Sequence, residues 1–161
     1  MGSGKSTVGR ELAKRLGLHH RDTDAAIVHR SGRSISEIFA DSGEAEFRRL
    51  ESRILAEVLA GPVTVVSTGG GIVMEESNRE LLTAPFVVWL DAGVDALEKR
   101  VRGGRGRPLL DGDVRSNLEA KVAERNPHYR EVADLRVDTS AMSRRATVEF
   151  LLDAVGKDPT P

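Results

Sequence analysis

The 161-residue chain contains no cysteine, has no long hydrophobic run and carries almost no net charge. The absence of cysteine excludes disulfide bonds and cysteine-ligated metals, and it is compatible with a reducing cytoplasm. The longest apolar runs, such as residues 85–90, have the length of a strand and are too short to cross a bilayer. With 24 basic and 25 acidic residues, the chain lacks the surplus of positive charge that non-specific nucleic-acid binding requires.

The chain also begins without the apolar segment of a secretion signal, and it contains no internal repeat and no dividing linker. Its composition, 39% hydrophobic and 30% charged, is typical of a globular protein, and its length suits one domain. We therefore expect a single cytoplasmic domain over residues 1–161 that binds neither membranes nor nucleic acid.

Short apolar or β-branched runs alternate with amphipathic helical patterns along the chain. The predicted strands are residues 63–67, 86–90 and 135–138, with a weaker one at 19–23. The predicted helices are residues 5–16, 48–59, 91–102, 114–129 and 143–155. Strands that alternate with helices predict an α/β fold whose parallel sheet is covered on both faces.

The strongest motif is the second half of a Walker A sequence, formed by Gly2, Ser3, Gly4, Lys5, Ser6 and Thr7. Its glycines allow backbone N–H groups to surround phosphate oxygens, and the helix that begins there adds its positive dipole end. We expect Lys5 to reach the β- and γ-phosphates of a nucleotide and Ser6 to ligate Mg²⁺. A Gly/Ser-rich start that merely precedes a helix is the simpler alternative, but the motif leads directly into an amphipathic helix.

The full Walker A motif begins with a further glycine and follows a hydrophobic strand, and both would lie ahead of Met1. We therefore expect the first, central strand of the sheet to be missing from this chain. Without that strand the phosphate loop would lose an anchor, and nucleotide affinity would fall.

Five further motifs follow in series: Asp22-Thr23-Asp24, then residues 43–48, 67–71, 107–110 and 125–129. In this order the chain resembles the shikimate kinase family over its whole length apart from the missing strand. The resemblance implies a three-layer α/β/α P-loop kinase fold. It also implies a substrate-binding segment at residues 24–51 and a mobile lid at about residues 102–114, where three glycines and three arginines predict an exposed loop.

The resemblance implies transfer of the γ-phosphoryl group of ATP to the 3-hydroxyl of shikimate, giving shikimate 3-phosphate and ADP for aromatic amino acid biosynthesis. Arg48 and Arg125 match arginines that hold the carboxylate, a task suited to the planar guanidinium. Asp24 matches the aspartate that orients the attacking hydroxyl, and its action as the base stays open. The substrate-facing glycine turn of the family corresponds to Gly69, Gly70 and Gly71.

On the nucleotide side, Arg107 matches the lid arginine that closes over the γ-phosphate, which makes it a catalytic candidate with Lys5 and Asp24. Arg100 matches a residue that stacks on adenine, and residues 139–144 would cover the other face of the base. Asp22 matches an aspartate that contacts Mg²⁺, more plausibly through water than directly.

Each of these residues also has a simpler interpretation. Arg48 and Arg125 lie on helices of mixed charge, where a lone arginine is usually solvated. Asp24 could be the N-cap of the helix that follows it. Asp22 could be a turn residue, and Arg100 could pair with an acid on its own helix. The histidines lack the spacing of metal ligands, so no chemistry is assigned to them.

Two other functions stay open from the sequence. A gluconate or nucleoside-monophosphate kinase would share the phosphate loop but should lack the paired arginines behind Asp24. A catalytically impaired nucleotide-binding homologue would result if the first strand were truly absent. For the kinase reading we expect ATP, ADP, shikimate and Mg²⁺ as partners of a monomer.

Overall fold

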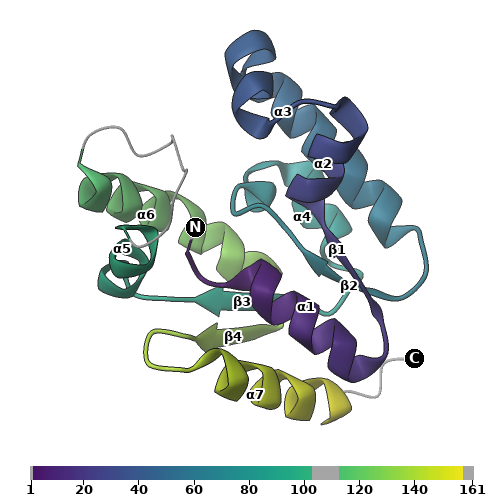
Figure 1. Cartoon of the computed structure of the whole chain (residues 1–161), viewed down its shortest axis with the longest axis vertical. Coiled ribbons are helices and arrows are strands. Elements are labelled where there is room, and N and C mark those ends of the chain that lie inside the picture. Colours follow the sequence, from purple (N-terminus) through teal and green to yellow (C-terminus); the bar gives the residue numbers. More distant parts are fainter. Residues whose placement is uncertain (1, 103–112, 158–161) are drawn as a thin grey trace.

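The computed structural model describes residues 2–102 and 113–157. Within them, two pairs of parallel strands form the centre of the molecule (Figure 1). β1 (His19–Asp22) pairs with β2 (Thr64–Ser67), and β3 (Val88–Asp91) pairs with β4 (Leu135–Asp138). Parallel strands separated by helices confirm the predicted α/β class.

Seven α-helices and one 3₁₀ helix surround these strands in the described residues. They are α1 (Lys5–Leu16), α2 (Thr23–Ser31), α3 (Ile35–Leu59), η1 (Ile72–Met74), α4 (Glu76–Leu81), α5 (Val94–Arg102), α6 (Val114–Val132) and α7 (Arg144–Lys157). α1 packs against α7 and against β1 and β2, whereas α6 packs against α5, α4 and η1. In Figure 1, α2 and the start of α3 form an arm that projects beyond the strands.

α1 has the predicted bounds because both of its ends are glycines in left-handed conformation. Gly4 precedes the helix with φ 85°, and Gly17 ends it with φ 68° and a backbone N–H that bonds to carbonyls of the last turn. Its buried residues Val8 and Leu12 join a core with Val137 of β4 and residues of α7. The start of this helix is therefore held firmly at the carboxyl edge of the strands.

α3 is much longer than the predicted helix 48–59. A capping box starts it at Ser34, where the hydroxyl accepts from the Glu37 N–H (3.2 Å) and the Glu37 carboxylate accepts from the Ser34 N–H (2.7 Å). Gly43, with φ 79° and ψ 175°, kinks it. Phe47 and Ile54, beyond the kink, are buried against Ile27 of α2 and other apolar residues of the arm.

The two strand pairs are not hydrogen-bonded to each other. No strand among the described residues pairs with both β2 and β3. A cavity of about 230 Å³ is lined by Thr64 and Val66 of β2 and by Val88 and Leu90 of β3. The expected further strand ahead of Met1 stays a prediction.

Other predicted bounds need small corrections. α5 begins at Val94 and not at residue 91, because Asp91 belongs to β3 and its carboxylate accepts from the guanidinium of Arg136 on β4 (2.6 Å). α6 continues through Pro127 as far as Val132. Among the described helices, none is both long enough and apolar enough to span a membrane.

Candidate active site

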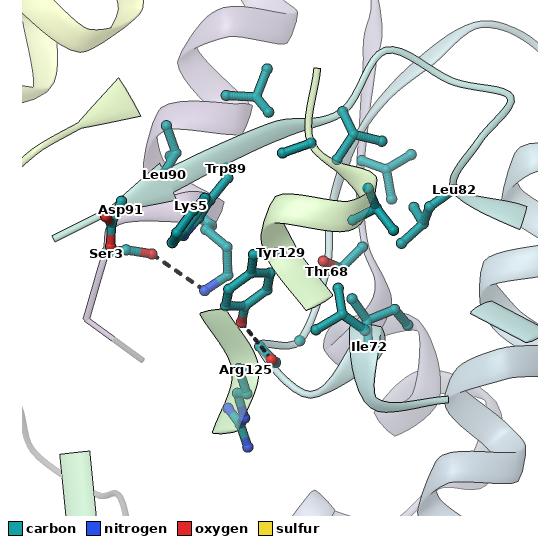
Figure 2. A pocket seen from close by; sticks show the side chains of 18 of the residues that line it. Ser3, Lys5, Thr68, Ile72, Leu82, Trp89, Leu90, Asp91, Arg125 and Tyr129 are labelled. Carbon is teal, nitrogen blue, oxygen red and sulfur yellow. Dashed lines mark hydrogen bonds between the residues drawn. The ribbon is translucent and has the colours of Figure 1, made fainter. Parts of the chain in front are cut away.

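The phosphate loop leads into α1 at the carboxyl edge of the strands. Gly4 provides the left-handed turn, and its carbonyl accepts from the N–H groups of Thr7 and Val8. The first turn of α1 contains no acidic residue of its own, and its N-terminus carries the positive end of the helix dipole. The Lys5 ammonium donates to Ser3 Oγ at 3.4 Å and lines the 230 Å³ cavity (Figure 2). This geometry suits an anionic phosphate chain.

Ser6 and Asp22, the two predicted metal residues, are brought together. Ser6 Oγ donates to Asp22 Oδ2 at 2.6 Å. The other oxygen, Oδ1, accepts from the backbone N–H groups of Asp24 (3.1 Å) and Ala25 (3.2 Å), which makes Asp22 the N-cap of α2. The alternative that Asp24 is the N-cap is therefore wrong, because Asp24 lies in the first turn of the helix.

These two oxygens fit the hard donors that Mg²⁺ prefers. The described residues contain no group of three or more His, Cys, Asp and Glu that could hold a metal on its own. The chain therefore offers part of a coordination shell, which fits an ion that keeps several waters and shares phosphate oxygens.

A half-buried hydrogen-bonded chain of Ser67 and His20 holds the first turn of α1. Ser67 Oγ donates to the Lys5 carbonyl at 3.2 Å and lies 2.9 Å from His20 Nε2. Since the Ser67 hydroxyl has one proton and gives it to Lys5, His20 must donate through Nε2–H. Desolvation by burial lowers the pKa of His20, which favours the neutral ring. This histidine therefore holds Ser67, which in turn holds the first turn of α1.

On the other side of the site, Arg48 is held by two acids of its own helix. Its Nη1 donates to Glu51 Oε2 at 2.6 Å and its Nη2 to Glu44 Oε1 at 2.9 Å. Glu51 is fully buried, and its Oε1 atom has no hydrogen-bond partner. Desolvation raises the pKa of Glu51, although the bond from Arg48 opposes this. Arg48 is therefore not the solvated surface arginine of the simpler interpretation.

The glycine turn after β2 packs directly against these side chains. A Cβ atom at Gly69 would lie 2.6 Å from Glu51 Oε1 and 2.8 Å from Asp24 Oδ1, and one at Gly71 would collide with the Arg48 guanidinium. The Gly69 N–H donates to Thr23 Oγ1 at 3.2 Å. The turn thus brings Asp24 and Arg48 together with the backbone of the three glycines.

α6 supplies the second predicted arginine. Arg125 and Arg48 line one open pocket of about 610 Å³, and Arg125 also lines the smaller cavity together with Lys5. Its Nε atom is buried without a hydrogen-bond partner. A buried donor on Arg125 and a buried acceptor on Glu51 therefore both lack partners beside the same turn, as expected of a site that binds a polar ligand.

Arg100 donates hydrogen bonds to two segments near the predicted adenine site. Its guanidinium donates to the Thr139 carbonyl (2.6 Å), to Thr139 Oγ1 (3.2 Å) and to the Gly2 carbonyl (3.4 Å). It therefore connects the phosphate loop with the segment after β4, and its stacking on adenine stays a prediction. Arg107 and residues 103–112 of the predicted lid lie outside the described residues.

Sequence reasoning missed Glu51 and Tyr129. Glu51 had a signal, because an acid that shares the apolar face of Phe47, Ile54 and Leu55 occupies a core position of the helix. Tyr129 belongs to a motif that was noticed, but its contact could not be foreseen. Its hydroxyl donates to the backbone carbonyl of Gly70 at 2.5 Å, and a sequence does not display such a partner.

Sequence comparison points to one family. A family model described as shikimate kinase matches residues 1–155. The shikimate kinase of Mycobacterium marinum is 44% identical over 161 residues, which cover 99% of this chain and 87% of that relative. The shikimate kinase of Halorhodospira halophila is 44% identical over 162 residues, covering 99% and 92% of the two chains.

Solved structures give the same result. The shikimate kinase from Acinetobacter baumannii in complex with shikimate superposes with a TM-score of 0.93 at 34% identity, over 100% of this chain and 91% of that chain. The shikimate kinase from Bacteroides thetaiotaomicron gives a TM-score of 0.88 at 30% identity, over 97% and 94%. The predicted P-loop kinase fold is thereby confirmed.

Proposed function

The chain belongs to the shikimate kinase family, and we propose that the site around its phosphate loop transfers the γ-phosphoryl group of ATP to the 3-hydroxyl of shikimate. The observation that carries this proposal is the cluster in which Arg48, Glu51 and Asp24 pack against the glycine turn. Arg125 extends from this cluster to the cavity that Lys5 lines. A carboxylated polyol held by this cluster and a triphosphate held by the phosphate loop would meet between the two.

The residues on the nucleotide side neutralise the negative charge of ATP and position its γ-phosphoryl group. Residues 2–7 surround the phosphates with backbone N–H groups, and Lys5 contacts the β- and γ-phosphates. Ser6 would hold Mg²⁺ directly and Asp22 through water, and the ion would supply positive charge to the phosphates of the donor. Arg100 keeps the phosphate loop and the segment after β4 in contact below the base.

The acceptor side binds shikimate by both of its polar ends. Arg48 and Arg125 bind the carboxylate, for which a guanidinium offers two parallel N–H donors. Glu51 keeps Arg48 in a single orientation through the 2.6 Å bond. Asp24 accepts a hydrogen bond from the 3-hydroxyl and turns its oxygen toward the γ-phosphate.

In the chemical step this oxygen forms a bond to the γ-phosphorus while the bond to the bridging oxygen of ADP breaks, and the hydroxyl proton is released. Asp24 is the candidate to receive that proton. Arg107 stabilises the charge on the phosphoryl group from the lid, and closure excludes water that would otherwise hydrolyse ATP.

A coupled assay that follows ADP release tests the proposal with shikimate, gluconate and nucleoside monophosphates as acceptors. Of these acceptors, we expect only shikimate to be phosphorylated. Phosphorylation of gluconate or a nucleotide in its place would overturn the proposal, as would failure of the protein to bind ADP with Mg²⁺ in a thermal-shift experiment.

The role of Arg48 is tested by Arg48→Ala, which should weaken shikimate binding and leave ADP binding nearly unchanged. Arg53→Ala is the matched control, because Arg53 lies on the same helix and forms an exposed ion pair with Glu57. An equal loss of shikimate affinity in both variants would contradict the role given to Arg48.

The metal ion, the oligomeric state and the cellular compartment are inferred from membership of the family. We propose that Mg²⁺ is the metal used with ATP and that the enzyme acts as a cytoplasmic monomer. Replacing Mg²⁺ with Ca²⁺ in the assay should abolish turnover, and light scattering behind a sizing column should give the mass of one chain.

A further inference from the structure

Tyr129 is the only tyrosine of the chain, and it connects α6 to the glycine turn of the acceptor site. Its hydroxyl donates to the Gly70 carbonyl at 2.5 Å (Figure 2). Its ring stacks on Trp89, the only tryptophan, with ring centroids 5.4 Å apart and planes inclined by 29°. Trp89 lies in β3 and is buried. A continuous contact therefore runs from β3 through Tyr129 to the glycine turn.

The glycine turn has one hydrogen bond from each side of the site. Thr23 of α2 accepts from the Gly69 N–H at 3.2 Å, and Tyr129 of α6 donates to the Gly70 carbonyl. A peptide unit is planar, so fixing the Gly70 carbonyl also fixes the direction of the N–H of Gly71. Because glycines have the widest conformational freedom of all residues, such a turn needs external contacts to keep one shape.

The same turn sets the position of the acceptor-binding side chains. Gly71 packs on the Arg48 guanidinium, and Gly69 packs on Glu51. Arg125 lies one helical turn before Tyr129 on α6, so the helix that carries the second carboxylate-binding arginine also carries the hydroxyl that holds the turn. A shift of the Gly70 peptide would change the geometry between Arg48 and Arg125.

We propose that the Tyr129 hydroxyl is a positioning group for the acceptor: it holds the glycine turn so that shikimate meets Arg48, Arg125 and the turn backbone in one geometry. This inference rests on the proposed function, because it assigns the turn to the acceptor. Tyr129 takes no part in the chemical step, although it lines the same cavity as Lys5 (Figure 2).

Tyr129→Phe tests the proposal, because the variant keeps the ring and its stacking on Trp89 and loses only the hydroxyl. We expect KM for shikimate to rise about tenfold, the effect of losing one hydrogen bond to a half-buried carbonyl. KM for ATP and the thermal shift with ADP should not change. Thr83→Val is the matched control, since it removes a hydroxyl that donates to a backbone carbonyl (Glu80, 2.7 Å) at an exposed site just after the C-terminal end of α4.

The lone tryptophan gives a second measurement that does not depend on turnover. Since Trp89 contacts Tyr129 directly, shikimate binding should change the Trp89 emission of the native enzyme. In Tyr129→Phe, the same titration should reach its midpoint at about tenfold higher shikimate concentration. Equal midpoints in the two proteins would overturn the proposal.

The failures of the two proposals can be distinguished. If the native enzyme phosphorylates shikimate and Tyr129→Phe has the same KM, the positioning role is wrong and the proposed function stands. If Tyr129→Phe lowers the melting temperature and weakens the binding of ATP and of shikimate equally, the hydroxyl only stabilises the fold. If the native enzyme does not phosphorylate shikimate at all, the proposed function fails and the inference fails with it.

Discussion

Gly4 and Gly71 lie on opposite sides of the candidate site, and each must be glycine for a different physical reason. Gly4, in the phosphate loop, has φ 85°, and a Cβ atom there would meet nothing within 4 Å. Gly71, in the turn after β2, has φ −94°, which any residue can adopt, but a Cβ atom there would collide with the Arg48 guanidinium. The first position restricts backbone conformation, and the second restricts space.

This difference supports the binding proposed for the two substrates. In that proposal the phosphate loop binds with backbone N–H groups, so its sequence must permit a particular path of the main chain. The turn after β2 is a surface against which charged side chains are packed, so its sequence must leave room for them. Substitutions on the two sides should therefore separate nucleotide binding from shikimate binding.

The largest effect is expected when the one cationic side chain of residues 2–7 is removed. Lys5→Ala should lower kcat by about 10³-fold, because a charge that stabilises the transferring phosphoryl group is lost. Shikimate binding, measured by titration without nucleotide, should be unchanged. Lys14→Ala is the control, since Lys14 is exposed on the same helix. A large loss of shikimate affinity in Lys5→Ala would show that the two sides are not separate.

The next effect concerns space in the acceptor turn. In Gly71→Ala the added methyl group must displace the Arg48 guanidinium, which Glu51 and Glu44 hold in place. Because a displacement of about 1 Å can cost about 10²-fold, we expect a rise of that order in KM for shikimate. ADP binding should be retained.

A matched control is Gly156→Ala, where a Cβ atom would meet nothing within 4 Å. This variant should have native kinetics. If Gly71→Ala also bound shikimate normally, the guanidinium would have room to move, and the turn would not be limited by space.

The third effect concerns conformation in the phosphate loop. Gly4→Ala places a side chain in left-handed backbone, which costs about 1–2 kcal/mol. If the loop has this conformation only when α1 is intact, the same cost should lower ADP affinity about tenfold. Gly17→Ala is the control, because Gly17 has φ 68° and equally open surroundings at the other end of the same helix. It should lose similar stability but keep ADP affinity. Equal ADP affinity in the two variants would contradict the conformational requirement at Gly4.

Sequence reasoning placed the four strands and the start of α1 to within about two residues. β2, β3 and β4 lie in short apolar or β-branched runs, and α1 begins directly after a glycine of the phosphate loop. It also named residues that the fold brings together, namely Ser6 with Asp22 and Arg48 with the glycine turn. These successes depend on motifs whose residues act through a local backbone shape or a fixed order along the chain.

Two of the failures have a common physical cause, which is a contact between parts distant in sequence. Glu51 matters because a turn eighteen residues later covers it, and Tyr129 matters because its hydroxyl reaches the carbonyl of Gly70. Such contacts are decided by tertiary packing and not by local propensity. The beginning of α3 was missed for a local reason: Gly43 interrupts the helical pattern, although Ser34 and Glu37 form a capping box.

The smallest effect concerns Glu51, the carboxylate that fills the space beside Gly69. Burial raises its pKa above the ordinary value of 4.5, so the folded protein binds this proton more tightly than the unfolded chain does. The resulting stability is fully present below pH 4.5 and is lost as the pH rises through the raised pKa. The Glu51→Gln side chain cannot titrate. Between pH 4.5 and 8, the free energy of unfolding of this variant should therefore rise relative to that of the native protein, which loses stability over the same range.

Urea unfolding at a series of pH values measures this difference, and Glu57→Gln provides a control of opposite sign. The bond from Arg30 lowers the pKa of the exposed Glu57, so its contribution is present above pH 4.5 and is lost as the pH falls through the lowered pKa. Glu57→Gln should therefore be less stable than the native protein by a small constant amount above pH 4.5, and this difference should disappear at the acid end, where the native protein loses its advantage. If Glu51→Gln and the native protein kept a constant difference from pH 4.5 to 8, then Arg48 would fully offset the burial of Glu51, and the acceptor turn would pack against an ordinary ion pair.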